Sequence, residues 1–299
     1  MTDYEQFLRL GIAQTVVDGE NAWKDSMQMS AIEERAVIAQ IQHQLASIAQ
    51  DPVPAKVVLL PELSVPRGFL PQLQTIAAQM NAIIIAGMDF DVVPRKSMTV
   101  RNRAAVVIPN AWGTAKRSSR STIRYVGKTY AAWGEHQLLQ QHGYSFHSIP
   151  EVWVFNAERF GKFAVAVCFD FLDLERVAMY RLGIQHLFIL AYNKDLPTFD
   201  HAAEALSRMI YCNVVVCNTG SHGGSLAVSP YSGVGRRVIY RHVGSPLSTS
   251  QTISLPVADL ILAQTNTWPA GRDRVFKNLP PGSELVHDLT MQNFPIQQA

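Results

Sequence analysis

Short apolar runs alternate along this chain with stretches of helical period, and this alternation limits the fold more than any other feature. In the first third, strands are predicted at 7–17, 56–63, 82–90 and 101–109, with helices at 30–50 and 70–81. Later strands are predicted at 152–157, 161–169, 186–192, 214–220, 224–230, 236–242 and 252–257, with helices at 173–183 and 201–213. Runs of Val, Ile and Leu between amphipathic helices are typical of sheets covered by helices, so we predict an α/β protein.

The helix predicted from Ser30 has the clearest start. Ser30 and Glu33 have the spacing of a capping box, in which each side chain bonds the other's backbone N–H. Beyond them, apolar side chains recur on one face: Val37, Ile38, Ile41, Leu45 and Ile48. This face is expected to pack against a sheet.

Length and composition favour one large domain. The chain has 299 residues, 47% of them hydrophobic, which is enough to bury a large core. No low-complexity linker or short repeat divides it, so 1–299 is predicted to be a single domain. The Pro-rich tail, 270–299, is expected to be irregular and to be free for contact with another subunit.

Charge and cysteine content indicate the class of partner and the cellular compartment. The formal charge of +2 comes from 26 basic and 24 acidic residues scattered along the chain, so no global field favours nucleic acid or a membrane. Three cysteines without a tight framework predict reduced thiols. The start, "MTDYEQFLRL", has no apolar signal region, and the apolar runs are too short to span a bilayer. We therefore expect a soluble cytoplasmic protein.

Three reactive residues lie at or near predicted strand ends. Glu62 follows "VVLLP", Cys168 ends "FAVAV", and Lys128 lies in "YVGKTY", in a segment predicted to be irregular. Singly, each has an ordinary interpretation as core filler or solvated charge. Together they suit nucleophilic catalysis, because a thiol needs a base to become a nucleophile and an ammonium group stabilises an oxyanion.

The segments around these residues resemble the nitrilase superfamily, carbon–nitrogen hydrolases with a Glu-Lys-Cys triad. "LLPELSVPRGF" resembles the family's glutamate segment, "RYVGKTY" its lysine segment and "VAVCFDFLDLE" its cysteine elbow, with Asp170 and Glu175 in the family's register. "CNTGSHGGSLAVSPYSG" resembles later family strands, and its matching residues are Asn218, Ser225 and Pro230. The resemblance implies a single-domain, four-layer α-β-β-α sandwich.

The resemblance also implies residue roles. Glu62 takes the proton of Cys168, whose sulfur attacks an amide, carbamoyl or nitrile carbon, and Lys128 with the backbone N–H of Phe169 holds the oxyanion. The amine or ammonia leaves, and Glu62 then activates water to hydrolyse the thioester. Glu135, seven residues after Lys128, matches a second family glutamate that positions substrate or water. No metal or organic cofactor is required.

The chain departs from the family pattern beside the triad. Tyr130-Ala131-Ala132 replaces a frequent His-Leu-Pro, Leu172 replaces a common arginine, Leu174 a common proline, and Tyr211 a frequent helix glutamate. The resemblance therefore indicates the reaction class and leaves the substrate open.

Other segments of the sequence are candidates for substrate, anion or metal binding. Residues expected to line a substrate pocket are Tyr130, Trp133, His136, Tyr192 and Asn193. The basic segment 115–124 is interpreted as a solvated loop, with the alternative that it lies near Lys128 and selects acidic substrates. No His-x-x-x-His or Cys-x-x-Cys pair occurs, so no metal site is predicted, and Cys212 and Cys217 are interpreted as structural.

Three functional hypotheses follow. The first is a thiol hydrolase of a non-peptide C–N bond in an amide or N-carbamoyl compound, with nitriles less favoured. The second is a nitrilase-like binding or regulatory module without turnover, which the altered flanks suggest. The third is an N-acyltransferase that uses the same thioester. The partners expected are a small-molecule substrate and, from the resemblance, a second copy in a homodimer.

Overall fold

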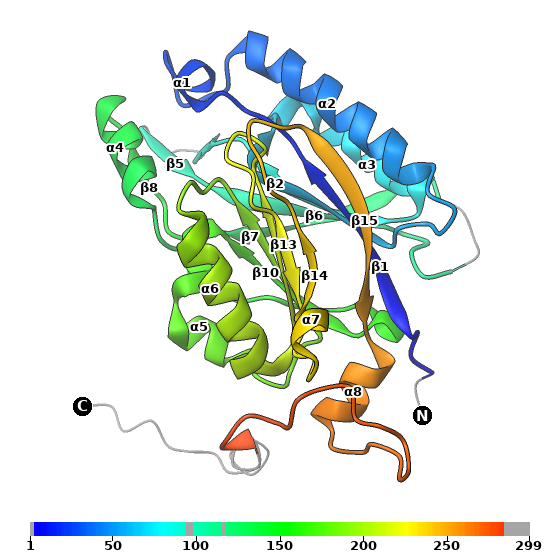
Figure 1. The fold of residues 1–299 in the computed structure, drawn as a ribbon. Coiled ribbons are helices and arrows are strands. Elements are labelled where there is room, and N and C mark those ends of the chain that lie inside the picture. Colours follow the sequence, from blue (N-terminus) through cyan, green and yellow to red (C-terminus); the bar gives the residue numbers. More distant parts are fainter. Residues whose placement is uncertain (1–2, 94–97, 115–117, 284–299) are drawn as a thin grey trace.

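The computed structural model describes residues 3–93, 98–114 and 118–283 and has four layers (Figure 1). Two six-stranded sheets pack face to face, with helices over their outer faces. In order across the first sheet the strands are β15 (Thr249–Pro256), β1 (Phe7–Gln14), β2 (Val57–Val65), β3 (Ile83–Met88), β6 (Arg103–Pro109) and β7 (Ser121–Gly127). Across the second they are β14 (Val238–Arg241), β13 (Leu226–Val228), β12 (Asn213–Asn218), β11 (His186–Ala191), β10 (Lys162–Val167) and β9 (Val154–Asn156). The α-β-β-α sandwich is the predicted architecture.

Helices complete the outer layers. Over the first sheet lie α2 (Ala31–Ala49) and α3 (Leu70–Met80), and over the second lie α5 (Leu174–Ala178) and α6 (Leu196–Leu206) (Figure 1). A small third sheet joins β4 (Asp91–Val92), β5 (Thr99–Arg101) and β8 (Ser145–Phe146). Short helices complete the described chain: α1 (Gly19–Ala22), α4 (Trp133–Gln141), α7 (Val234–Arg237) and α8 (Ala258–Gln264). No helix in the described ranges is long and apolar enough to cross a membrane.

Strand β2 shows why a continuous apolar run is needed in this fold. Successive side chains of a strand point to opposite faces. Val57 and Leu59 lie in the core between the two sheets, whereas Val58 and Leu60 lie in the core beneath α2 and α3. Both faces are covered, so each buried side chain contributes about 1.5–3 kcal/mol of transfer free energy.

Parallel pairing sets the position of two candidate site residues. In the first sheet β1, β2 and β3 are parallel, and in the second β10, β11 and β12 are parallel. Strands β2 and β11 also contact each other across the interface between the sheets. The carboxyl ends of β2 and β10, which carry Glu62 and Cys168, therefore lie on the same side of the sandwich.

The predicted capping box is half correct. Ser30 is the N-cap of α2, and its hydroxyl accepts a hydrogen bond from the Glu33 N–H at 3.4 Å. The Glu33 carboxylate instead accepts from the Asp18 N–H at 3.3 Å, while the Ser30 N–H donates to the Ala22 carbonyl at 2.8 Å. The preceding helix, α1, satisfies the backbone group that the box would have used.

Several predicted boundaries were wrong. The segment before Lys128 is strand β7, because it pairs along its whole length with β6. The helix predicted at 173–183 is only α5, and the one at 201–213 starts earlier, where Asp195 caps α6, and ends in a π turn at Ser207–Tyr211. Residues 236–242 begin within α7 before β14. Of the tail 270–299, residues 284–299 lie outside the described part of the chain.

Buried His186 at the start of β11 predicts a pH-dependent loss of stability. Its Nε2 donates to the Phe160 carbonyl at 3.0 Å and its Nδ1 accepts from the Asn213 amide at 3.1 Å, so the ring is neutral. Burial lowers the pKa of His186 from 6.5 to about 4. Between pH 6.5 and 4 the unfolded chain therefore binds a proton at this histidine that the folded chain does not bind. The free energy of unfolding is highest above pH 6.5 and falls by about 3 kcal/mol as the pH falls towards 4.

This loss is measured by urea unfolding across that pH range. His186→Gln keeps one donor and one acceptor without a titrating ring, so its stability should fall less steeply than that of the parent. His201→Gln, in the exposed part of α6, is the matched control and should follow the parent. Parallel curves for all three proteins would contradict the role assigned to His186.

Candidate active site

Lys128 is buried between two carboxylates. Its Nζ lies 2.8 Å from Oε1 of Glu62 and 2.6 Å from Oε2 of Glu135. The side chains are only 2%, 2% and 6% exposed, in the order Lys128, Glu62, Glu135. Burial opposes the charge of Lys128, but the two carboxylates outweigh it and hold the pKa of Lys128 well above its usual value. The lysine is therefore an ammonium ion at neutral pH.

Three separate elements bring these groups together. Glu62 lies in β2, Lys128 directly follows β7, and Glu135 lies in the first turn of α4. The Glu135 carboxylate also accepts from the Ala132 N–H at the start of that helix, at 3.2 Å. A carboxylate in the first turn of a helix is favoured by the unpaired N–H groups there, so Glu135 is fixed as both cap and ion-pair partner.

Asn102, which sequence reasoning missed, links both carboxylates. Its Nδ2 donates to Glu62 Oε1 at 2.8 Å and to Glu135 Oε1 at 2.9 Å. It precedes β6, where Arg103 pairs with Gly127, and its carbonyl accepts from the Lys128 N–H at 2.9 Å. The register of the β6–β7 hairpin therefore places Asn102 beside Lys128, and no local sequence signal indicates this contact.

A break in β2 directs Glu62 into the cluster. The pairing of β2 with β3 shifts register between Leu60 and Val65, and Leu63 has a φ of 55°. Opposite the break, a Cβ on Gly87 would lie 2.2 Å from the Pro61 carbonyl oxygen and 2.3 Å from the Glu62 Cα. Only glycine lets β3 approach this closely, so Gly87 is part of the support for Glu62.

Cys168 begins a tight turn directly after β10. Its φ is +47°, a left-handed conformation that is uncommon for residues other than glycine, and its side chain is 5% exposed. Burial, the negative charge of Glu62 and a hydrogen bond with that carboxylate raise the pKa of the thiol well above its usual value, while Lys128 opposes the shift. The thiol is thus protonated and has a carboxylate acceptor beside it.

Tyr192 connects the other end of Glu62 to β11. Its N–H, just after β11, donates to Glu62 Oε2 at 2.8 Å. The neighbouring Asn193 N–H donates to Asn218 Oδ1 at 2.9 Å, and Asn218 returns a bond from Nδ2 to the Asn193 carbonyl at 2.7 Å. Asn218 and Ser225, which the sequence resemblance singled out, hold this loop together, since the Asn218 N–H donates to Ser225 Oγ at 3.0 Å.

A buried ion pair ties the lysine segment to the cysteine turn. Asp170 accepts from the Thr129 N–H at 2.8 Å and the Tyr130 N–H at 3.0 Å, and Arg176 Nη1 lies 2.8 Å from its carboxylate. Arg176 Nη2 also donates to Thr129 Oγ1. Asp170 and Arg176 are 0% and 5% exposed, so the pair fixes Lys128 relative to Cys168. Arg176 was missed by sequence reasoning, which singled out its exposed neighbour Glu175 instead.

The residues predicted to line a pocket are spread more widely. Tyr130 is 46% exposed and its hydroxyl donates to Asp173 at 3.1 Å, while Trp133 on α4 is 77% exposed. His136 is exposed and pairs with Gln140 at 3.1 Å. Of the five, Tyr192 is the one with a hydrogen bond to the cluster. Phe169, whose N–H was predicted to bind the oxyanion, follows Cys168 in the turn and has a half-exposed side chain.

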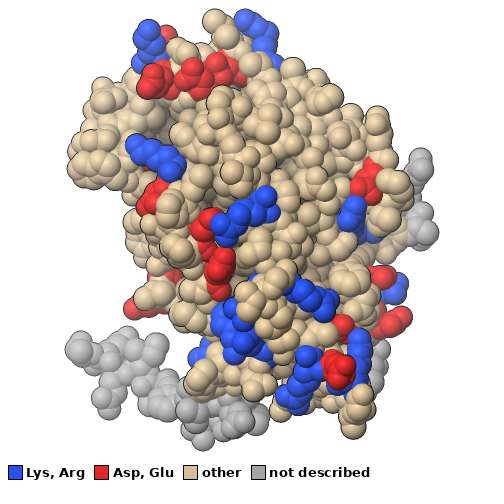
Figure 2. Space-filling view, viewed as in Figure 1, with Lys and Arg blue, Asp and Glu red and all other residues tan. Residues whose placement is uncertain are grey.

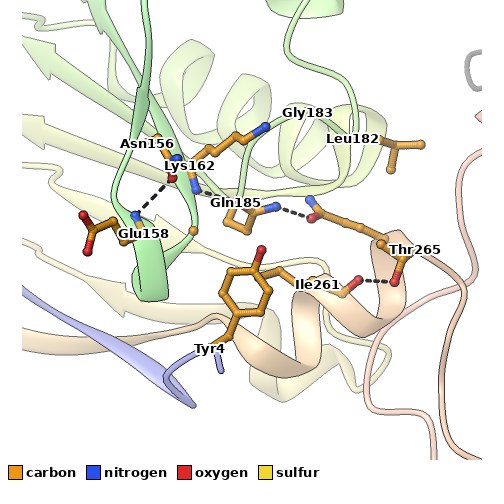
Figure 3. Close-up of a pocket in the computed structure, with 11 residues that line it drawn as sticks. Tyr4, Asn156, Glu158, Lys162, Leu182, Gly183, Gln185, Ile261 and Thr265 are labelled. Atoms are coloured by element: carbon orange, nitrogen blue, oxygen red, sulfur yellow. Dashed lines mark hydrogen bonds between the residues drawn. The ribbon is translucent and has the colours of Figure 1, made fainter. Parts of the chain in front are cut away.

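A separate cavity of about 450 Å³ lies away from this cluster (Figure 3). It is lined by Lys162, which begins β10, and Gln185, which precedes β11, whereas Cys168 follows the other end of β10. The described part of the basic segment, 118–124, is also remote from the cluster. Arg120 precedes β7 and Lys128 follows it, so the described part of 115–124 begins at the opposite end of that strand from the cluster, contrary to the alternative prediction. Residues 115–117 lie outside the described ranges.

Comparison with known proteins identifies the fold. No protein-family model matches the sequence, and no curated protein matches it. Among solved structures, the chain is similar to Nit3 of Saccharomyces cerevisiae, a member of the nitrilase superfamily, with a TM-score of 0.64 and 13% identity over 92% of this chain and 99% of that one. It is also similar to XC1258 of Xanthomonas campestris, a CN-hydrolase superfamily protein with an arsenic adduct in its active site. There the TM-score is 0.61 with 15% identity, covering 91% of this chain and 100% of that one.

A third similar structure is a mutant of an amidase of the nitrilase superfamily from Nesterenkonia AN1. The TM-score is 0.60 with 14% identity, covering 86% of this chain and 94% of that one. The chain therefore has the nitrilase-superfamily fold, as the sequence resemblance predicted. It reaches this fold with a divergent sequence.

Arg176 provides a test of the support around the site. Arg176→Met leaves the Asp170 carboxylate buried without its cation, so we expect unfolding to become easier by about 3–5 kcal/mol. Arg241→Met, which breaks solvent-exposed pairs with Asp200 and Glu204, should cost about 1 kcal/mol or less. Urea unfolding measures both, and equal losses would contradict the role of Arg176. Asp170→Asn in the Arg176→Met background should recover part of the loss.

Proposed function

We propose that this protein is a thiol hydrolase of non-peptide C–N bonds, acting on an amide or N-carbamoyl compound. The observation that supports this most is the burial of a thiol, a carboxylate and an ammonium group in one cluster: Cys168, Glu62 and Lys128. A thiol that bonds a carboxylate has a proton acceptor within reach, and the ammonium beside it stabilises negative charge on a reacting oxygen.

In the first step, Glu62 accepts the Cys168 proton as the sulfur attacks the carbonyl carbon. The oxyanion that forms is stabilised by the Lys128 ammonium and the Phe169 N–H. The C–N bond then breaks, Glu62 gives its proton to the leaving nitrogen, and a thioester remains on Cys168. Atoms and protons balance, because the proton that left the thiol departs with ammonia or the amine.

In the second step, water attacks the thioester carbon. Glu62 accepts a proton from the water, the carbon–sulfur bond breaks, and the proton returns to Cys168 as the acid is released. Glu135 keeps Lys128 in place in both steps, since it lies 2.6 Å from the same nitrogen. Glu135 also positions the substrate or the attacking water.

The charge of the cluster favours proton transfer that is coupled to attack. Glu62 and Glu135 carry two negative charges against one positive charge on Lys128, and a free thiolate would add a third negative charge in a buried site. The raised pKa of Cys168 reflects this cost together with burial. If the sulfur bonds to the substrate carbonyl carbon as its proton leaves, the negative charge moves to the oxyanion and no free thiolate forms. Deprotonation of Cys168 is therefore coupled to attack on bound substrate.

The narrow access to Cys168 limits the substrate. With the side chain only 5% exposed, a slender acyl or carbamoyl group reaches the sulfur more readily than a folded peptide does. Fluoroacetamide, which adds covalently to the active-site cysteine of mutants of the Nesterenkonia amidase, is a compound of this size. Small primary amides and N-carbamoyl compounds are therefore the first substrates to test.

Selective alkylation tests the nucleophile. Iodoacetamide at neutral pH should modify Cys168 and leave Cys212 and Cys217 unmodified, since both are fully buried and burial raises their pKa further from neutrality. Glu62→Gln should slow the reaction at Cys168 by about 10² or more, because the base is lost. Glu175→Gln, the same change in an exposed residue, should react like the parent. Peptide mapping by mass spectrometry gives each rate, and equal rates in both variants would contradict the role of Glu62.

Ammonia release tests turnover. The parent should release ammonia from at least one member of a panel of primary amides and N-carbamoyl compounds, and Cys168→Ala should release none. Glu135→Gln should lower kcat by about 10²–10³, since Lys128 then loses one of its two carboxylates. Fast alkylation of Cys168 with no ammonia from any panel member would instead support a binding module or an acyltransferase.

A further inference from the structure

A second cavity, of about 300 Å³, carries an unusual excess of positive charge. Three of its lining residues are cationic, Arg208, Arg237 and Lys277, and one is acidic, Glu204. Glu204 already lies 3.1 Å from Arg241. Within the described residues none of the three cations has a carboxylate within 4.0 Å, so the described part of the chain does not neutralise their charge.

Two residues of the cavity wall also carry a buried donor that has no partner among the described residues. The Ser229 side chain is 2% exposed, and its hydroxyl makes no hydrogen bond to any described residue. The Nη1 of Arg208 is likewise buried and unpartnered. Both atoms are buried, so a ligand would reach them only after the side chains turn towards the cavity. It would then satisfy two donors that are costly to leave without a partner.

The cavity walls come from elements that fix these groups. Arg208 lies in the π turn after α6, Ser229 follows β13, and Arg237 ends α7. The Ser229 N–H donates to the Arg237 carbonyl at 2.9 Å, and the Lys277 N–H donates to the Pro230 carbonyl at 3.1 Å. In the view of Figure 2, basic side chains gather on the lower part of the molecule, over α7 and towards α8 (compare Figure 1). The donors are therefore held together within a wider basic surface.

The cavity is separate from the Cys168 cluster. Val228, in its wall, pairs with Val214 near the amino end of β12. Cys168 follows Val167, which pairs with Leu190, and Leu190 pairs with Cys217 near the carboxyl end of β12. Because β10, β11 and β12 are parallel, the cavity lies near the amino ends of these strands and Cys168 lies at their carboxyl ends.

We propose that this cavity binds a phosphorylated small molecule, with the phosphate held by Arg208, Lys277 and Ser229. A phosphate monoester carries close to two negative charges and accepts several hydrogen bonds, which matches three cations better than a single carboxylate does. The cavity is larger than a phosphate group alone requires, and the remaining space accommodates the organic part. The site is a second one, independent of the hydrolytic function proposed above.

Titration calorimetry of the full-length protein tests this at constant ionic strength, with inorganic phosphate, phenyl phosphate and benzoate as probes. Both phosphates should bind saturably, and phenyl phosphate should bind more tightly than benzoate. Arg208→Gln and Lys277→Gln should each weaken phosphate binding about tenfold, the usual effect of losing a charged hydrogen bond. Arg236→Gln removes the same charge from the exposed neighbour of Arg237 and should change the affinity less than twofold.

Ser229→Ala adds a readout that a general charge effect would not give. It should weaken phosphate binding and yet leave the ligand-free protein at least as stable to heat, because an unsatisfied buried hydroxyl is removed. Cys168→Ala should bind phosphate like the parent, which separates this result from the outcome of the hydrolase experiments. The proposal is overturned if no probe saturates, if benzoate binds as tightly as phenyl phosphate, or if Arg236→Gln weakens binding as much as Arg208→Gln.

Discussion

The ammonium group of Lys128 is the charge on which the rest of the site depends. Removing such a group from water costs several kcal/mol, and the cost is recovered only where partners with good geometry surround it. Glu62 and Glu135 supply those partners from β2 and α4, and Asn102 holds both carboxylates in place. Strand β2 is distant in sequence from β7 and α4, yet all three must meet within hydrogen-bond distance, and the two-sheet sandwich provides the rigid frame for this.

The same interaction explains why the thiol stays protonated. Two carboxylates around one ammonium give the cluster a net negative charge, and a thiolate in that field would be costly. In the proposed reaction, the nucleophile and its base are therefore a neutral thiol and the carboxylate beside it before substrate binds. The strained φ of +47° at Cys168 directs the sulfur towards this carboxylate, and the Asp170–Arg176 pair keeps the lysine segment against the cysteine turn.

The alternation of apolar strands and amphipathic helices predicted the α/β class because it depends on local patterns, whereas the four-layer sandwich was implied by the family resemblance. The continuous apolar run of β2 predicts a strand buried on both faces, and the ends of such strands predict where Glu62 and Cys168 lie. Their meeting with Lys128 was an inference from family resemblance, not from periodicity. Asn102 and Arg176 were not predictable, since each acts through contacts set by strand register or by a turn. The polar run before Lys128 gave no strand signal because β7 is an edge strand with one largely exposed face.

The lysine cluster and the basic cavity lie towards opposite ends of the strands of the second sheet, and they differ in how their cations are paired. At the carboxyl end, both oxygens of Glu62 and both oxygens of Glu135 have donors, and Lys128 bonds to both residues. That end is preorganised, as a site that stabilises charge during a reaction must be. At the amino end, the cations of Arg208, Arg237 and Lys277 line one cavity and have no carboxylate within 4.0 Å among the described residues. Like charges held close together destabilise one another, and an anionic ligand would relieve that repulsion. For this reason the basic cavity is interpreted as a binding site and the lysine cluster as a catalytic one.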